Sequence, residues 1–320
     1  MNNERSPRNR TLTVSEEECQ ALKKKILYPQ GEFFSIVDIL NKTICANLFD
    51  ILDSLPKGFA DLLIIDPPYN LDKDFNGLKF SKRDDDKYLE YLFGWFPGII
   101  KTLKPGGSVY LCGDWRNTFS LYSVMRDYLV IRNRIIWQRE KGRGAKANWK
   151  NSSEDIWFAT LGENYYFDVE AVKQKRRVIA PYKENGRPKD WEETDNGNFR
   201  LTCPGNFWDD ISVPYWSMPE NTDHPAQKPE KLIAKLILAS CPAGGVVFDP
   251  FLGSGTTSVV AKKLRRDYIG VEINEKYCCW AEKRLIAAEQ DKSIQGYTDS
   301  VFWERNTLNL QKKERSHLRG

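Results

Sequence analysis

The tetrapeptide Asp66-Pro67-Pro68-Tyr69 holds the residues of this sequence best suited to chemistry. It follows an apolar run at 62–65 that is typical of a buried parallel strand. Open α/β sheets bind their ligands at the carboxyl ends of such strands. Because proline lacks an N–H and has a fixed backbone angle, the Pro-Pro pair ends the strand and can direct the Pro67 carbonyl into a cleft.

The Asp66 carboxylate and the Pro67 carbonyl would then form two hydrogen-bond acceptors beside the aromatic face of Tyr69. This arrangement suits a planar ring that carries an exocyclic amino group, and an amino-nucleobase fits the description. The same four residues are also compatible with a simple turn after a strand.

A second motif favours the functional interpretation. Residues 246–257 combine an apolar strand with a glycine turn and the start of a helical pattern, and residues 268–272 form another strand that ends in Glu272. Strand, glycine turn, helix, strand and acid are the parts of a nucleoside-binding βαβ unit, in which the acid accepts hydrogen bonds from the ribose hydroxyls.

A nicotinamide dinucleotide site and a plain packing turn are the alternatives for the glycine turn. The dinucleotide is disfavoured because Ser258 stands at the third glycine position and Asp249 lies directly before the turn. A pyrophosphate gains nothing from that carboxylate, whereas a cationic sulfonium amino acid does.

These motifs resemble, in type and order, those of the β-class amino-methyltransferases of DNA, in which the target-amine half precedes the S-adenosylmethionine half. The segment His224-Pro225-Ala226-Gln227-Lys228-Pro229 matches a third signature of that family. The segment 44–52 resembles the start of the catalytic half, although Ala46-Asn47 replaces the usual Gly-Asp. The resemblance covers about residues 40–285.

The resemblance implies an α/β fold with a doubly wound, mostly parallel, Rossmann-like sheet and an inserted target-recognition region. It implies methyl transfer from S-adenosylmethionine to the N6 amino group of an adenine that is flipped out of duplex DNA. The catalytic residues expected are Asp66, Pro67, Pro68 and Tyr69. The cofactor-binding residues expected are Asn47, His224, Lys228, Asp249, Phe251, Gly253, Ser254, Gly255, Thr256, Thr257 and Glu272.

Other activities are weighed against adenine methylation. Cytosine-N4 methylation is the closest alternative, but the family more often has serine in place of Asp66 in those enzymes, so the aspartate of this chain favours adenine. Carbon-5 cytosine methylation needs a cysteine nucleophile after proline, and this chain has only the reverse order, at Cys203-Pro204 and Cys241-Pro242. A non-catalytic DNA-binding subunit is disfavoured by the two intact motifs. Compact enzymes of this kind often accompany a restriction endonuclease that acts at the same site, and a homodimer is compatible with the sequence.

Composition agrees with a large α/β domain. The chain has 320 residues, of which 41% are hydrophobic, and a net charge of +4, so DNA binding must come from local clusters of basic residues. With no secretory signal and no apolar run of membrane length, the sequence predicts a prokaryotic cytoplasmic protein whose seven scattered cysteines are reduced. Two histidines and the lack of paired cysteines predict no metal site.

The sequence divides into five segments. Residues 1–30 form an extension in which the capping box of Ser15 and Glu18 predicts a short helix through Leu27, compatible with a solvated helix or a DNA-clamping arm. Residues 31–138 form the catalytic half, 139–220 the target-recognition region, 221–290 the cofactor half, and 291–320 a basic tail. Within the catalytic half we expect strands at 61–65, 108–112 and 131–137, a helix at 88–103 and a mobile loop at 71–87.

The target-recognition region interleaves basic residues with aromatic residues and glycines, a pattern that suits contact with phosphates and bases. A solvated face over a small core is the alternative. The DNA-binding residues expected are Arg143, Lys146, Lys150, Arg176 and Arg177.

Overall fold

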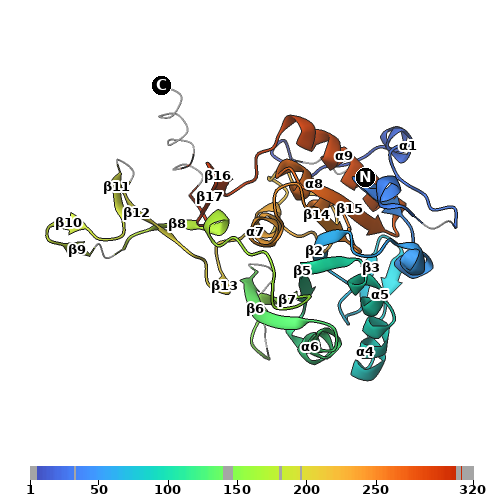
Figure 1. Ribbon diagram of the computed structural model, residues 1–320. Helices are drawn as coiled ribbons and strands as arrows, with labels where there is room; N and C mark the ends of the chain where they lie inside the picture. Colours follow the sequence, from blue (N-terminus) through green and yellow to red (C-terminus); the bar gives the residue numbers. More distant parts are fainter. Residues whose placement is uncertain are drawn as a thin grey trace.

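The computed structural model describes residues 6–31, 34–139, 147–179, 182–194, 197–307 and 311. These residues contain an eight-stranded sheet in the order β1-β15-β14-β2-β5-β7-β6-β13 (Figure 1). In that order the strands are β1 (Lys42–Cys45), β15 (Asp267–Glu272), β14 (Val246–Asp249), β2 (Ala60–Ile65), β5 (Leu103–Gly113), β7 (Ser153–Thr160), β6 (Val130–Gln138) and β13 (Phe207–Trp208). Neighbouring strands are parallel except at β7, which is antiparallel to both β5 and β6. The predicted doubly wound, mostly parallel sheet is confirmed.

Apolar side chains alternate between two cores, one on each face of this sheet. Leu62 and Ile64 of β2 belong to one core, and Leu63 and Ile65 belong to the other. The first core is covered by α7 (Glu230–Ser240), α8 (Thr256–Lys263) and part of α9 (Glu275–Gln290). The second is covered by α2 (Ile36–Ile39), α3 (Leu48–Ile51), α4 (Asp85–Phe93), α5 (Phe96–Ile100) and α6 (Thr118–Arg126). Burial on both faces explains why these strands read as continuous apolar runs.

The predicted local elements are mostly present, with shifted ends. The capping box of Ser15 and Glu18 starts α1 (Glu16–Lys23), which ends before Leu27 because Leu27 bridges Ile44 at the sheet edge. The expected helix at 88–103 is two helices, α4 and α5, separated near Gly94, with a proline in the first turn of α5. Short 3₁₀ turns occupy Leu52–Ser54, Trp115–Asn117 and Glu170–Val172.

The segment expected as a mobile loop after the catalytic turn contains a hairpin. Its strands are β3 (Lys73–Phe75) and β4 (Leu78–Phe80), and they are antiparallel. The Asn274 side chain donates to the Phe75 carbonyl oxygen at 3.3 Å, so the hairpin contacts the cofactor half of the chain.

The region predicted for target recognition divides between two sheets. Strand β7 belongs to the central sheet, between β5 and β6. A second sheet, in the order β11-β12-β8-β17-β16, projects to the left in Figure 1 together with the hairpin β9–β10. These strands are β8 (Gln174–Arg177), β9 (Lys183–Glu184), β10 (Arg187–Pro188), β11 (Glu192–Thr194), β12 (Gly197–Thr202), β16 (Tyr297–Thr298) and β17 (Val301–Trp303).

The C-terminal segment is more than the basic tail expected from its composition. Strand β17 pairs in parallel with β8, and Phe302 and Trp303 are buried. The apolar side chains of Val301–Trp303 are the physical reason, because they bury surface that a solvated tail would leave exposed. The basic residues at 312–320 lie outside the described residues.

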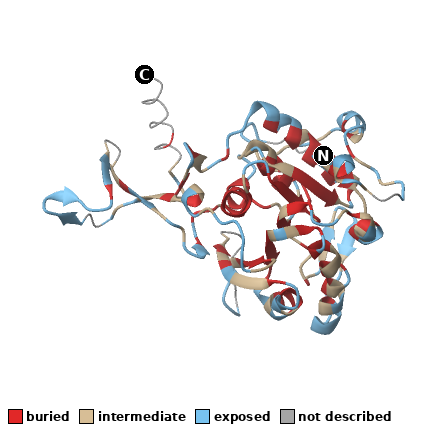
Figure 2. Ribbon diagram, viewed as in Figure 1, coloured by how far each residue is buried: buried red, intermediate tan, exposed pale blue. Residues whose placement is uncertain are grey.

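Helix α7 packs against β2 and β5 of the central sheet and also contacts β17 of the second sheet. All of its residues are buried (Figure 2). Lys231 and Lys235 reach from this helix to the carboxylate of Asp210, at 2.6 and 2.9 Å, and Lys231 also donates to the carbonyl oxygen of Trp303. Two buried ammonium groups therefore share one buried carboxylate beneath the second sheet.

The prediction that every cysteine is reduced is wrong for Cys19 and Cys279, which form a disulfide with their Cα atoms 5.5 Å apart. The pair forms because α1 packs on α9, which brings together residues from opposite ends of the chain.

Among the described residues, no helix is both long enough and apolar enough to cross a membrane.

Candidate active site

The two sequence motifs meet because β2 and β14 are neighbours in the central sheet. After β2 the next central strand is β5 on one side, whereas after β14 it is β15 on the other. Such a reversal opens a crevice at the carboxyl ends of the strands.

A cavity of about 440 Å³ lies at this point. Most of the predicted residues line it: Asp66, Pro67, Pro68, Tyr69, His224, Lys228, Asp249, Phe251, Gly253, Ser254, Thr256, Thr257 and Glu272. Its wall also includes Lys73 and Phe75 of the β3–β4 hairpin.

Glu272 is held rigidly at the end of β15. One carboxylate oxygen accepts from the Gly253 amide and the other from the Asn274 amide, both at 2.8 Å. Burial raises the pKa of Glu272 above its usual value, while the two amides oppose that shift. Gly253 has a φ of +56°, and a Cβ there would lie 3.0 Å from the His224 ring, so a larger residue would be strained.

Asp249 is the second acid of the cofactor side and is fully buried. It accepts from the Phe251 amide at 2.9 Å and from the Thr257 hydroxyl, and burial raises its pKa to about 7. The nearby Ser254 hydroxyl is buried without a hydrogen-bond partner among the described residues. A buried acid that has no ion-pair partner among the described residues, together with the unsatisfied hydroxyl, fits the cationic, amino-acid end of S-adenosylmethionine.

The raised pKa of Asp249 predicts a pH-dependent affinity for S-adenosylmethionine. A cationic ligand stabilises the carboxylate, so binding must first remove the proton that Asp249 carries below about pH 7. Affinity is expected to rise with pH up to that value, by up to about tenfold per pH unit, and then to level off. Calorimetry across this range tests it.

The matched control is Asp249→Asn, which should bind more weakly and lose this pH dependence. The control is needed because burial and Glu230 also raise the pKa of Glu220 to about 7. If the variant keeps the wild-type pH profile, Asp249 is not the titrating group.

On the target side, Asp66 belongs to a compact cluster with Tyr69, Lys228 and Glu154. The Tyr69 hydroxyl lies 2.8 Å from Asp66 and 2.6 Å from Glu154. The Lys228 ammonium lies 2.6 Å from Asp66 and 2.8 Å from Glu154. The structure thus places Lys228 beside the Asp66 carboxylate, whereas the family resemblance implied that Lys228 binds the cofactor.

Sequence reasoning missed Glu154 and Arg139. Glu154 is 3% exposed on β7, and Arg139 pairs with it. Burial alone would raise the pKa of Glu154, but Lys228 and Arg139 outweigh burial and lower it to about 2. The sequence does contain a sign of Glu154: this acid lies just before the apolar run 156–159, where a buried carboxylate without a partner would be costly, so a cationic partner could have been expected.

His224 is neutral and packed. Burial, reinforced by Lys73 and Lys228, lowers its pKa to about 3. Its ring meets Tyr277 edge-on with centroids 4.5 Å apart. It therefore shapes the cavity wall as an uncharged ring.

Two predicted cofactor residues do not line the cavity. Asn47 caps α3, and its side chain accepts from the Phe49 amide at 3.3 Å. Gly255 begins α8 with a φ of +85°, and a Cβ there would lie 2.5 Å from Ala281. Its glycine is required for helix packing rather than for ligand approach.

The predicted DNA-binding residues are distributed over several regions. Arg143 and Lys146 lie outside the described residues, and Lys150 is exposed. Arg176 on β8 lies 3.7 Å from Asp209 and 3.6 Å from Glu304. The backbone amide of Arg177 donates to Glu304. Their contact with DNA stays a prediction.

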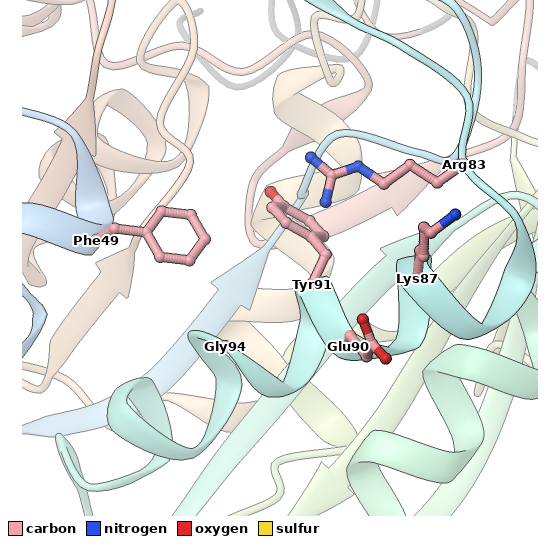
Figure 3. A pocket seen from close by; sticks show the side chains of 6 residues that line it. All are labelled: Phe49, Arg83, Lys87, Glu90, Tyr91 and Gly94. Carbon is pink, nitrogen blue, oxygen red and sulfur yellow. The ribbon is translucent and has the colours of Figure 1, made fainter.

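A separate hollow of about 590 Å³ lies beside α4 (Figure 3). It is lined by Phe49, Arg83, Lys87, Glu90, Tyr91 and Gly94, and the Arg83 guanidinium lies over the Tyr91 ring. It contains no predicted site residue.

The fold and the cavity are those of an α/β enzyme that brings a nucleoside cofactor to a carboxylate-lined substrate site. The family model described as DNA methylase matches residues 60–283, and the chain belongs to this N6/N4 DNA methyltransferase family. It is therefore a DNA methyltransferase that uses S-adenosylmethionine, as the sequence predicted.

Individual proteins that resemble this chain also carry the names of DNA methyltransferases. The chain is 32% identical over 263 residues to the type II methyltransferase M.HpaI of Haemophilus parainfluenzae, covering 81% of this chain and 77% of the relative. It is 33% identical over 271 residues to the DNA adenine methyltransferase YhdJ of Escherichia coli K12, covering 82% and 88%. The PvuII cytosine-N4-specific DNA methyltransferase shares the fold, with a TM-score of 0.55 and 16% identity over 78% of this chain and 92% of that chain.

Glu272→Gln is expected to weaken S-adenosylmethionine binding by about 1–3 kcal/mol, because a charge-assisted hydrogen bond to the ribose is lost. Calorimetry measures the change. Glu275→Gln is the matched control, since Glu275 is exposed and pairs with Lys23. Equal affinities for the two variants would show that Glu272 only braces the glycine turn.

Proposed function

We propose that this protein methylates the N6 amino group of adenine at a specific site in duplex DNA. The observation that carries the proposal is that Asp66 and Pro67 line one cavity with Asp249 and Glu272. The target amine and the methyl donor would meet there.

Asp66 and the Pro67 carbonyl orient the target amine. Its lone pair is delocalised into the ring, so the amine is a weak nucleophile. Two acceptors that hold the N–H bonds direct the lone pair toward the methyl group and stabilise the positive charge that develops on nitrogen. The N–C bond forms as the donor's S–C bond breaks, and the amine then gives up one proton toward Asp66.

The base must leave the helical stack to reach this buried position, so the proposal includes base flipping. The Tyr69 ring would cover the face of the flipped base. The projecting sheet β11-β12-β8-β17-β16 would contact the DNA around the target, where Arg176 and Arg177 of β8 lie.

Adenine is favoured over cytosine because the relative named a DNA adenine methyltransferase is 33% identical over most of both chains. Cytosine-N4 methylation is the second candidate, because the PvuII enzyme has this fold. Incubation with unmethylated plasmid DNA and methyl-labelled cofactor, followed by nucleoside mass spectrometry, is expected to give N6-methyladenine alone. N4-methylcytosine instead would overturn the choice of base.

The type II methyltransferase relatives support a role in protecting DNA from a restriction endonuclease that acts at the same site. Plasmid methylated to completion should then resist that endonuclease. The homodimer and the prokaryotic cytoplasmic location remain predictions from the sequence.

A further inference from the structure

The cluster around Lys228 conflicts with the role proposed for Asp66. One oxygen of Asp66 accepts from Lys228 at 2.6 Å, and the other lies within hydrogen-bond distance of the Tyr69 hydroxyl, at 2.8 Å. Each oxygen of Asp66 therefore has a protein donor within hydrogen-bond distance, and one of these donors is a cation. Lys228 in particular competes with the neutral target amine for Asp66, so a shift of Lys228 or Tyr69 to another acceptor would strengthen the hold of Asp66 on the amine.

Glu154 is that acceptor. Its Oε1 atom is already 2.8 Å from the Lys228 ammonium and 2.6 Å from the Tyr69 hydroxyl. The single proton of Tyr69 can be donated to only one carboxylate at a time. Both donors can therefore release Asp66 without moving far and without losing their hydrogen bonds.

Glu154 is buried and bound by Arg139, and both features suit it to accept Lys228 and the Tyr69 proton from Asp66. Arg139 binds Oε2, the oxygen that faces away from Lys228 and Tyr69. Glu154 is thus kept ionised and oriented, and it can neutralise Lys228 when Asp66 turns to the substrate.

We infer that Glu154 is a positioning residue that takes over Lys228 and the Tyr69 proton when the target base enters, and so frees Asp66. The inference rests on the proposed function of Asp66 as acceptor of the target amine. It holds for either target base. Lys228 and the target amine compete for the Asp66 carboxylate. Because Glu154 offers Lys228 a second carboxylate, it lowers the cost of moving Lys228 away from Asp66.

The test compares Glu154→Gln with Asp155→Asn. Asp155 is the next residue of β7, is also buried, and pairs with Arg134 at 3.0 Å, so it controls for loss of a buried acid from the same strand. Glutamine keeps an acceptor oxygen for Tyr69 but no charge for Lys228. We expect kcat to fall at least about tenfold in Glu154→Gln and less than about threefold in Asp155→Asn, with S-adenosylmethionine affinity little changed in both. Each variant removes a buried carboxylate from an arginine, so both should lose thermal stability, and the rates are compared at a temperature at which both variants are folded.

The double variant Glu154→Gln/Lys228→Met separates competition from structural support. Removing the lysine removes the competitor, so this variant should turn over at least about threefold faster than Glu154→Gln alone. An unchanged kcat in Glu154→Gln, a similar loss in Asp155→Asn, or no recovery in the double variant would overturn the inference.

Wild-type enzyme and Asp66→Ala are measured beside these variants. If the wild type forms N6-methyladenine in DNA and Asp66→Ala does not, the proposed function stands whatever Glu154→Gln does. If the wild type transfers no methyl group to either base, the proposed function fails and the inference falls with it.

Discussion

Asp66→Ala is expected to abolish DNA methylation, with a loss of at least about a hundredfold in kcat, while S-adenosylmethionine still binds. The loss follows because one of the two acceptors that orient the amine and stabilise its developing charge is removed, an effect of about 2.7 kcal/mol or more. Folding should survive, because Lys228 retains Glu154 as an ionic partner. Single-turnover methylation of plasmid DNA gives the rate, and calorimetry gives the cofactor affinity.

The assignment of Asp66 to the target amine requires that Asp66→Ala lose methylation and keep its affinity for S-adenosylmethionine. Turnover above about a tenth of the wild-type value, a barrier change under about 1.4 kcal/mol, would contradict it. Loss of cofactor binding in parallel would instead place Asp66 in the cofactor site.

Asp210→Asn should produce the largest loss of stability, about 3–5 kcal/mol, because it leaves two buried ammonium groups without their shared carboxylate. Urea unfolding measures the change. Asp209→Asn is the matched control, since the neighbouring Asp209 is 52% exposed and pairs only loosely with Arg176. That control should change stability by less than about 0.5 kcal/mol.

The pH dependence of Asp210→Asn checks the same assignment. Burial lowers the pKa of Lys235 to about 8 and lowers that of Lys231 as well, in opposition to Asp210. A lysine whose folded-state pKa is lowered destabilises the protein when charged, so stability should rise as the pH goes from about 8 to 10.5, the ordinary lysine pKa, and should rise more in the variant than in the wild type. If the difference in unfolding free energy between the variant and the wild type did not change with pH, both lysines would have to reach water.

The parts of the site that could be predicted lie in contiguous motifs. The tetrapeptide at 66–69 and the glycine turn after β14 each join an apolar strand to residues of distinctive chemistry, and parallel strands bring their carboxyl ends to one edge. Local spacing therefore located Asp66, Asp249 and Glu272 correctly in one cavity. The family resemblance, and not local spacing, placed Asn47 among the cofactor-binding residues, and its side chain caps a helix instead.

Glu154 and the true position of Lys228 could not be predicted, because both depend on how distant strands are ordered. Glu154 faces Asp66 only because β7 inserts antiparallel between β5 and β6. Likewise, the disulfide between Cys19 and Cys279 requires α1 to pack on α9, a contact that no local pattern contains.

The pairing of β17 with β8 has a consequence for chimeras. Segment 139–220 looks like a cassette that could be exchanged between relatives to change the recognised site. In the structure its strand β8 is completed by β17, which enters from more than a hundred residues further along the chain. A transplanted cassette would leave an unpaired strand edge and the apolar surface of Phe302 exposed. Exchange of recognition between relatives would require both segments to be moved together.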